Sequence, residues 1–211
     1  MPKRLILMAG NIGTGKTSLT ERIGERLGWN TAYESVAENP YLPDFYADMR
    51  VWSFHLQIYF LGHRADQHLK LASDPQSAII DRSIYEDAHI FARALKHLGN
   101  FTERDYLAYL KLYQLIVDNL PRPDLLIYLK APVPVLMQRI QRRARNIENS
   151  ISEDYLSLLD RFYEEWMLNF DLCPVLTILS DDLDFVHKKQ HLDIVVERIK
   201  DKLSGKEEMV F

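Results

Sequence analysis

The sequence predicts an α/β fold in which a five-stranded parallel sheet is flanked by helices. Five short aliphatic runs alternate with stretches of helical periodicity, and most of the runs are continuous enough to be strands buried on both faces. Strands that alternate with helices favour parallel pairing through right-handed crossovers. A glycine-rich loop also follows the first run. The runs are Leu5–Met8, Thr31–Tyr33, Ala78–Ile80, Leu125–Leu129 and Val175–Leu179.

Regularly spaced apolar residues between these runs predict the helices. One apolar stripe covers residues 19–27 and ends at Gly28, and another follows Ser152. Thr102 and Asp105 resemble a capping box, which indicates that a further helix begins there. These helices would connect strands of the parallel sheet.

The bulk properties indicate a single domain that spans residues 1–211. The formal net charge of −4 provides no general attraction to nucleic acid or to an anionic membrane. Cys173 is the only cysteine, which excludes an intrachain disulfide and suits a reducing compartment. No signal peptide is recognisable, and no run approaches the roughly 18 apolar residues of a membrane helix. We therefore expect a cytoplasmic protein.

Residues 10–17 match the G-x-x-x-x-G-K-[ST] pattern of a phosphate-binding loop, or P-loop. The loop stands between the first predicted strand and the first predicted helix, as the pattern requires. Its backbone N–H groups and the helix dipole favour phosphate, Lys16 can reach the β- and γ-phosphates, and the Thr17 hydroxyl can bind Mg²⁺. The expected contacts to ATP are Gly10, Asn11, Ile12, Gly13, Thr14, Gly15, Lys16, Thr17 and Ser18.

Acidic residues follow two other predicted strands, at the edge where open α/β sheets bind ligands. Asp81 can hold Mg²⁺, partly through water, and Arg82 can neutralise phosphoryl charge, although a surface ion pair would look the same in sequence. Glu34 can accept the proton of an attacking hydroxyl, and on chemistry alone Glu38 is a rival. The sequence has no N-K-x-D segment of a GTPase and no L-S-G-G-Q segment of a transporter ATPase. These residues favour a kinase.

An arginine-rich segment lies late in the sequence. Four of the seven residues over 139–145 are arginines, and helical spacing places Arg139, Arg142 and Arg143 on one face. So many cations repel one another unless anions are nearby, so we expect a lid over residues 139–150 that closes on a transferring phosphoryl group. A basic surface helix is the simpler alternative.

These motifs together resemble the deoxyribonucleoside kinase family, which includes deoxycytidine, deoxyguanosine and deoxyadenosine kinases and mitochondrial thymidine kinase. The resemblance covers nearly the whole chain, with the motifs in family order and at similar spacings. The residues that carry it are the P-loop, Glu34 with Glu38-Asn39-Pro40, Trp52–Gln57, Asp81–Asp87, the arginine-rich segment and Asp181–Phe185.

The resemblance implies how the nucleoside is held. Glu34 is then the general base on the 5′-hydroxyl with Arg82 close by, and Gln57 reads an edge of the base. The other implied contacts are stacking by Phe91 and bonds to the 3′-hydroxyl from Tyr46 and Glu148.

Two further positions bear on the choice of base. Family members that also have an arginine and an aspartate at the positions of Arg64 and Asp87 favour cytosine or purine edges. Members that accept thymidine carry smaller apolar residues at these positions. Arg64 lies seven residues after Gln57, two helical turns along the same face. A purely structural ion pair is the alternative. We expect deoxyadenosine or deoxyguanosine as the favoured substrate, with deoxycytidine also accepted.

The resemblance also implies contacts to ATP, the expected phosphate donor, and to Mg²⁺, the expected cofactor. Asp81 is the acid on the Mg²⁺ side, where some members have glutamate, and it acts together with Thr17. The implied lid arginines are Arg139, Arg143 and Arg145, and the implied neighbours of the adenine are Asp182, Asp184 and Phe185.

Two other functions remain open on sequence alone. A nucleoside monophosphate kinase of the thymidylate kinase type also pairs a P-loop with an Asp-Arg segment, but Glu34 would repel its acceptor phosphate. An ATP-binding module without turnover would need no base for an acceptor hydroxyl.

The segments 52–73 and 102–119 are long for simple crossover helices. We expect them to form a helical layer beside the sheet or to contact a second subunit. Aromatic residues in both segments, together with the family resemblance, favour a homodimer joined through these helices. The aromatic residues are Tyr59, Phe60, Tyr109 and Tyr113.

Overall fold

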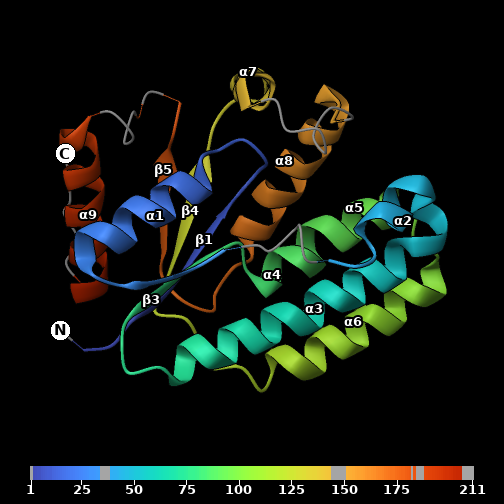
Figure 1. The fold of residues 1–211 in the computed structure, drawn as a ribbon, viewed down its shortest axis with the longest axis horizontal. Coiled ribbons are helices and arrows are strands. Elements are labelled where there is room, and N and C mark those ends of the chain that lie inside the picture. The colour runs from blue at the N-terminus through green and yellow to red at the C-terminus, as the bar shows by residue number, and fades with distance from the viewer. Residues whose placement is uncertain (1, 34–38, 144–150, 182, 184–187, 206–211) are drawn as a thin grey trace.

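The computed structural model describes residues 2–33, 39–143, 151–181, 183 and 188–205. Five parallel strands form one sheet in the order β2-β3-β1-β4-β5, which confirms the predicted fold class (Figure 1). The strands are β1 (Leu5–Gly10), β2 (Asn30–Ala32), β3 (Ala78–Asp81), β4 (Leu125–Lys130) and β5 (Val175–Leu179).

The strands differ in how completely the helices bury them. Every residue of β1 and β3 is buried, whereas β2 is half-buried and most of β5 is half-buried or exposed. The expectation of strands buried on both faces therefore holds for the centre of the sheet and fails at β2 and β5. The reason is that β2 and β5 are edge strands, with one neighbour each.

Helices begin and end largely where local chemistry predicts. Thr102 accepts a hydrogen bond from the backbone of Asp105, Ser152 caps the helix that follows it, and Gly28 ends α1 with φ of 67°. The helical segments are α1 (Lys16–Leu27), α2 (Leu42–Ala47), α3 (Met49–Ser73), α4 (Ile84–Glu86), the π-helical turn η2 (Asp87–Ala92), α5 (Arg93–His97), α6 (Glu103–Val117), α7 (Val133–Arg143), α8 (Glu153–Leu168) and α9 (Lys189–Ser204).

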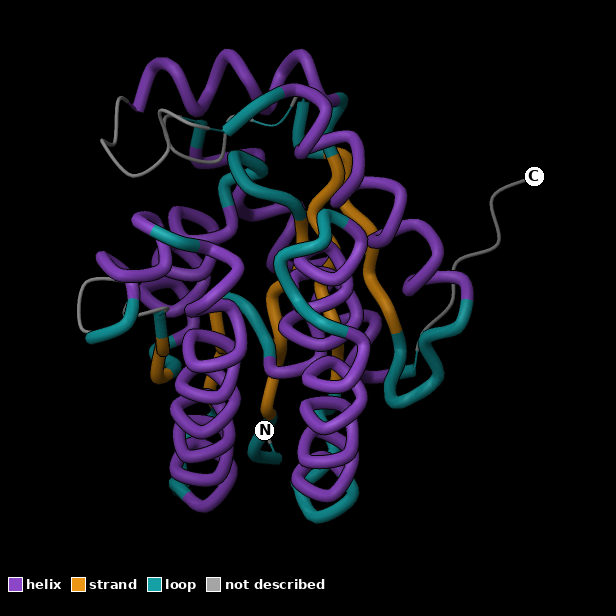
Figure 2. Tube along the Cα trace, turned by 90° about the vertical axis from the view of Figure 1, so that its right-hand side faces the viewer, coloured by secondary structure: helices purple, strands orange, loops and turns teal. Residues whose placement is uncertain are grey.

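Helices cover both faces of the sheet, and each face has its own core (Figure 2). Because side chains alternate along a strand, Leu5 and Leu7 of β1 face a core shared with α3, α6 and α8. Ile6 and Met8 face a second core shared with α1 and α9. The sheet is thus held between two layers, as a parallel sheet requires.

The long helices α3 and α6 pack side by side and form the predicted helical layer (Figure 1). α3 begins three residues before the expected start at Trp52, because the Asp48 carboxylate accepts hydrogen bonds from the backbone of Arg50 and Val51. Among the described helices, none is both long and apolar enough to cross a bilayer.

Candidate active site

The P-loop joins the end of β1 to the start of α1, and its backbone needs glycine at two points. Gly10 has φ of 146°, and a Cβ there would lie 2.4 Å from the carbonyl oxygen of Leu129. Gly13 has φ of 88°, and a Cβ there would lie 3.1 Å from the carbonyl oxygen of Leu136. Any side chain would therefore distort the loop. The predicted position between strand and helix is confirmed.

Lys16 lies folded back over the P-loop and is nearly buried. Its Nζ donates to the carbonyl oxygens of Gly10 at 2.7 Å and Asn11 at 2.9 Å. A lysine in this position carries a positive charge within the loop, next to the N-terminus of α1. The charge, the helix dipole and the loop backbone together suit a polyphosphate.

Thr17 and Asp81 meet at the ends of α1 and β3. The Thr17 hydroxyl donates to Asp81 Oδ2 at 2.5 Å. The other oxygen, Asp81 Oδ1, is buried and has no hydrogen-bond partner within the described part of the chain. A buried acceptor of this kind calls for a ligand. A hydroxyl and a carboxylate are oxygen donors that fit Mg²⁺ completed by water and phosphate.

Arg82 follows Asp81 in a backbone conformation that is unusual for arginine. Its φ is 71°, and it is the one non-glycine residue with positive φ among those described. Its N–H donates to Met8, its carbonyl accepts from Arg64 at 3.2 Å, and its guanidinium lies 4.3 Å from the ring centre of Phe91. The surrounding structure thus holds a buried cation at the carboxyl end of β3.

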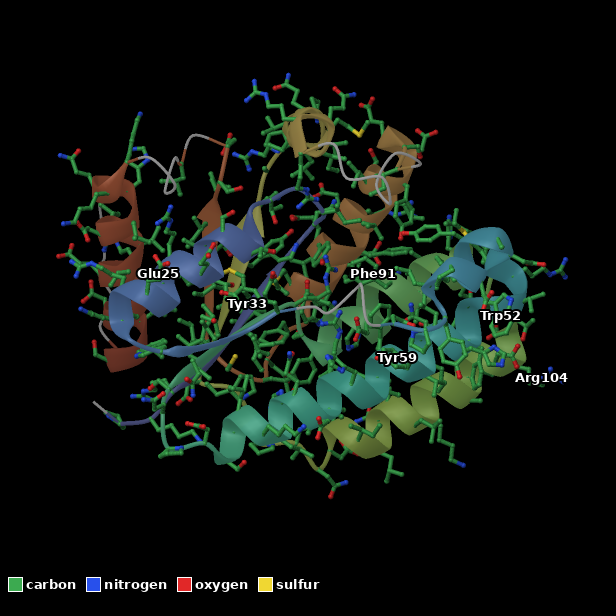
Figure 3. All side chains as sticks on the ribbon, viewed as in Figure 1. Glu25, Tyr33, Trp52, Tyr59, Phe91 and Arg104 are labelled. Atoms are coloured by element: carbon green, nitrogen blue, oxygen red, sulfur yellow. The ribbon has the colours of Figure 1, made fainter. Side chains whose placement is uncertain are left out.

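The buried ion pair Arg64–Asp87 lies between α3 and η2. Arg64 Nε is 2.5 Å from Asp87 Oδ2, and the two side chains are only 3% and 4% exposed. Gln57 shares the buried face of α3, and its Oε1 has no hydrogen-bond partner that the structure describes. Tyr59 and Phe91 project from the same two helical segments (Figure 3). This cluster offers buried donors and acceptors to a planar polar ligand.

Tyr155 of α8 is electrostatically coupled to two of the predicted site residues. Burial raises the pKa of Tyr155 to about 12, while Arg82 lowers it and Tyr46 raises it. Tyr46 is 45% exposed on α2.

The helix α7 carries the described part of the predicted lid. Arg139 donates to the carbonyl oxygens of Ser180 at 2.5 Å and Thr14 at 3.4 Å, and burial lowers its pKa. Arg142 and Arg143 are exposed at the end of α7. Arg139 therefore connects the P-loop to the end of β5 and does not share the exposure of the other two.

Several predicted site residues lie outside the described residues, and their roles remain predictions. They are Glu34, Glu38, Arg145, Glu148, Asp182, Asp184 and Phe185.

Glu86 is a site residue that sequence reasoning passed over. Its side chain is fully buried and accepts hydrogen bonds from Ser83, Gly10 and Tyr163. A signal was present, because Ser83 and Glu86 have the S-x-x-E spacing of a capping box, which the structure contains.

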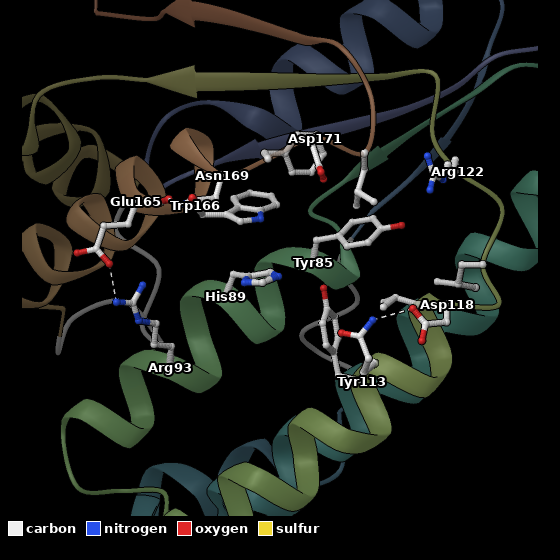
Figure 4. A pocket seen from close by; sticks show the side chains of 15 residues that line it. Tyr85, His89, Arg93, Tyr113, Asp118, Arg122, Glu165, Trp166, Asn169 and Asp171 are labelled. Atoms are coloured by element: carbon white, nitrogen blue, oxygen red, sulfur yellow. Dashed lines mark hydrogen bonds and ion pairs between the residues drawn. The ribbon is translucent and has the colours of Figure 1, made fainter.

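A cavity of about 500 Å³ is lined by residues of α4, η2, α6 and α8. Figure 4 shows Tyr85, His89, Tyr113 and Trp166 among its walls, with the rings of His89 and Trp166 stacked at 6.0 Å. None of the site residues predicted from the sequence lines this cavity. It is separate from the cluster around the P-loop.

Comparison with known proteins gives consistent results. The family model described as deoxynucleoside kinase matches residues 6–204. The chain is 38% identical over 202 residues to a deoxyadenosine/deoxycytidine kinase of Bacillus subtilis, covering 94% of this chain and 93% of that protein. It is 36% identical over 208 residues to a deoxyguanosine kinase of Lactobacillus acidophilus, covering 94% and 90%. A solved deoxyadenosine kinase of M. mycoides, with products dCMP and dCDP bound, superimposes with a TM-score of 0.82 at 31% identity, covering 93% of this chain and 99% of that one.

Proposed function

Because the chain belongs to the deoxynucleoside kinase family and phosphorylates deoxyribonucleosides, we propose that its favoured acceptors are the purine deoxyribonucleosides, with deoxycytidine also accepted. The proposed donor is ATP and the proposed product is the 5′-monophosphate. Family membership excludes the two alternatives left open by the sequence, a monophosphate kinase and a module without turnover.

The buried cluster of Gln57, Arg64 and Asp87 carries the proposed base preference. A guanidinium and an amide offer donors, and a carboxylate and an amide oxygen offer acceptors, within one apolar surrounding. Adenine, guanine and cytosine each carry an exocyclic amino donor beside ring or carbonyl acceptors, and thymine has no amino group. A site that buries such groups rejects a base that leaves them unpaired. The relatives named as deoxyadenosine, deoxycytidine and deoxyguanosine kinases support the same range.

The proposed mechanism needs little covalent chemistry from the protein. Glu34 takes the proton of the 5′-hydroxyl, and Arg82 and Lys16 neutralise the charge that develops on the phosphoryl group. Thr17 and Asp81 would hold Mg²⁺, which when bound offsets the charge of the donor phosphates. Arg139 and the rest of the lid would exclude water and add positive charge.

The deciding experiment measures ATP consumption with each of the four deoxyribonucleosides and with their 5′-monophosphates. We expect the highest kcat/KM with deoxyadenosine or deoxyguanosine, a lower value with deoxycytidine, the lowest with thymidine, and no acceptor activity of the monophosphates. A preference for thymidine would overturn the proposed specificity.

We also propose that the protein is a homodimer that joins through α3 and α6. Two of the four aromatic residues that suggested this in the sequence, Tyr109 and Tyr113, are buried in the core and are not available to a second subunit. The support comes instead from leucines on the outer surface of α6, since exposed apolar side chains in a group favour association. These are Leu107 at 56%, Leu112 at 44% and Leu115 at 65% exposure.

Sedimentation at micromolar concentration tests the dimer. A species of about twice the 24.8 kDa chain mass is expected, and replacement of Leu107 and Leu115 by glutamate should dissociate it. A wild-type protein that sediments only as a monomer would overturn the proposal.

The cytoplasm is the proposed location. The support is the single cysteine, Cys173, which cannot form an intrachain disulfide and so suits a reducing compartment. Cell fractionation tests the location, and recovery in a secreted fraction would contradict it.

A further inference from the structure

The buried carboxylate of Glu86 joins two segments that would surround the phosphates. Its Oε2 accepts from Ser83 N at 2.8 Å and Ser83 Oγ at 3.2 Å, and its Oε1 accepts from Gly10 N at 3.3 Å. Ser83 follows Arg82, and Gly10 opens the P-loop. These donors replace the hydration that a carboxylate loses on burial. One side chain therefore fixes the Arg82 turn relative to the loop.

The hydroxyl of Tyr163 lies between two acceptors. It is 2.7 Å from Glu86 Oε1 and 2.8 Å from the carbonyl oxygen of Gly10. Burial, and then the neighbouring Glu86, hold the pKa of Tyr163 well above its usual value, so the hydroxyl keeps its proton. One proton serves only one acceptor at a time.

Lys16 decides which acceptor Tyr163 serves. Its Nζ donates to the same Gly10 carbonyl at 2.7 Å, so that oxygen already has a strong donor. The Tyr163 proton is then best placed on the carboxylate, because a hydrogen bond to a charged acceptor is stronger. A ligand phosphate that draws Lys16 away would remove this donor from Gly10.

We propose that the Tyr163 hydroxyl turns from Glu86 to the Gly10 carbonyl when Lys16 moves to a bound phosphate, so that Tyr163 and Glu86 are positioning residues for the P-loop. No covalent bond is made or broken: the proton stays on the Tyr163 oxygen, and only the acceptor of its hydrogen bond changes. Glu86 keeps its bonds from Gly10 N and from Ser83. The inference rests on the proposed role of Lys16 in binding the donor phosphates.

Another contact between α8 and the P-loop supports this role. The Asn11 side-chain amide donates to the carbonyl oxygen of Leu156 at 2.9 Å. Leu156 lies seven residues before Tyr163, two turns along the same side of α8. Helix α8 thus contacts the loop at two successive loop residues, Gly10 and Asn11. These contacts hold the Tyr163 hydroxyl within reach of both Glu86 and the Gly10 carbonyl.

A double-mutant cycle tests the proposal through the dissociation constant of ATP with Mg²⁺, measured by calorimetry without nucleoside. Tyr163→Phe should weaken ATP binding about tenfold in the wild-type background, because the buried Gly10 carbonyl then loses its replacement donor in the ATP complex, whereas in the free enzyme Glu86 keeps its bonds from Gly10 N and Ser83. In the Lys16→Ala background the same change should have less than a twofold effect, since Gly10 loses nothing further on binding. The KM for ATP should rise similarly, with kcat and the nucleoside KM changed less than twofold.

Tyr128→Phe is the matched control. Tyr128 is also buried, stacks on Tyr163, and donates to Glu164 at 3.0 Å away from the loop. It should leave ATP binding unchanged in both backgrounds. An equal loss from Tyr163→Phe in both backgrounds, or no loss in either, would overturn the inference. A Lys16→Ala variant with normal ATP affinity would instead overturn the proposed phosphate site.

A second measurement does not depend on the folding of Tyr163→Phe. With 3-fluorotyrosine at position 163, the fluorine resonance should shift when ATP is added, and the shift should vanish in Lys16→Ala. The same label at position 128 is the control. A resonance at 163 that stays fixed on ATP binding would contradict the turn of the hydroxyl.

Discussion

The proposed phosphate side and the proposed base side of the candidate site are built from different parts of the chain. On the phosphate side, one loop of eight residues supplies backbone groups and Lys16, and residues 81–82 come from the next strand in the sheet. On the base side, Arg64 of α3 pairs with Asp87 of η2, Gln57 lies on the same buried face of α3, and all three side chains are buried. The first side depends on local backbone conformation, the second on tertiary packing.

This difference separates two kinds of defect. Loss of a charge on the phosphate side removes stabilisation that every acceptor needs, so all substrates should suffer alike. Loss of a group on the base side changes which base can form hydrogen bonds with the buried side chains, so the order of substrates should change. Each prediction below tests one side of this comparison.

Lys16→Ala should have the largest effect. We expect kcat/KM to fall by ~10³ with every deoxyribonucleoside, because the substitution removes a buried cation from the proposed path of the phosphoryl group. Steady-state kinetics with all four substrates is the measurement. Lys70→Ala, which removes an exposed lysine paired with Asp66, is the control. A changed order of substrates in Lys16→Ala would contradict the idea that the phosphate side acts on all substrates alike.

Glu34→Gln should lower kcat by ~10² or more and leave nucleoside binding largely intact, as expected for loss of a general base. The motive is its place directly after the second predicted strand. Single-turnover kinetics and nucleoside binding are the measurements, and Glu38→Gln is the matched control. If Glu38→Gln abolishes turnover and Glu34→Gln does not, the base is Glu38.

Replacing both Arg64 and Asp87 by alanine should act on the base side. We expect kcat/KM for deoxyadenosine and deoxycytidine to fall ~10-fold or more relative to thymidine, because an unpaired base edge costs about 1–3 kcal/mol per group. Removal of the pair also makes room for the thymine methyl. Each single substitution should be worse than the double one, since it strands a buried charge.

The control for that pair lies on the same helix. Asp66 and Lys70 form an exposed ion pair on α3, and their joint replacement by alanine should leave the substrate order unchanged. If the Arg64/Asp87 double variant also keeps the wild-type order, the buried pair is structural and does not read the base.

The two sides also differ in how far the sequence could predict them. The P-loop, with Asp81 and Arg82 after a strand, follows from local spacing and from the rule that ligands bind at the carboxyl ends of parallel strands. The pairing of Arg64 with Asp87 joins residues 23 positions apart, and the family resemblance, not periodicity, singled them out. Burial of Tyr109 was missed because helical spacing does not say which face a neighbouring helix covers.

Some misses were avoidable and others were not. Leu192, Val195, Val196 and Ile199 have the spacing of one helical face, so α9 could have been predicted. Residues 84–97 form one helical stretch interrupted by the π-helical turn η2, which breaks the 3.6-residue period. Glu86 shows its S-x-x-E pattern in the sequence, but its contact with Gly10 exists only in the folded chain.

The smallest predicted effect concerns the helix that carries the base side. His68 lies one turn after Arg64, is buried, and its Nε2 contacts the carbonyl oxygen of Pro121 at 2.7 Å. Burial lowers the pKa of His68 from 6.5. As the pH falls below about 6.5, the unfolded chain therefore takes up this proton first, and the free energy of unfolding decreases by up to about 1.4 kcal/mol per pH unit until the folded form is protonated too.

Urea unfolding between pH 5 and 8 measures this effect. His68→Gln should reduce the slope of the unfolding free energy against pH by an amount that corresponds to at most one proton. His97→Gln, at an exposed position, is the control for removal of an imidazole. The hydrogen bond described for His68 goes to Pro121 and not to the P-loop, so the ATP dissociation constant of His68→Gln at pH 7.5 should match the wild type. If His68→Gln leaves the slope of the unfolding free energy against pH unchanged, burial of this ring does not couple proton uptake to unfolding. The helix that carries the base side would then be no less stable in acid than the phosphate side.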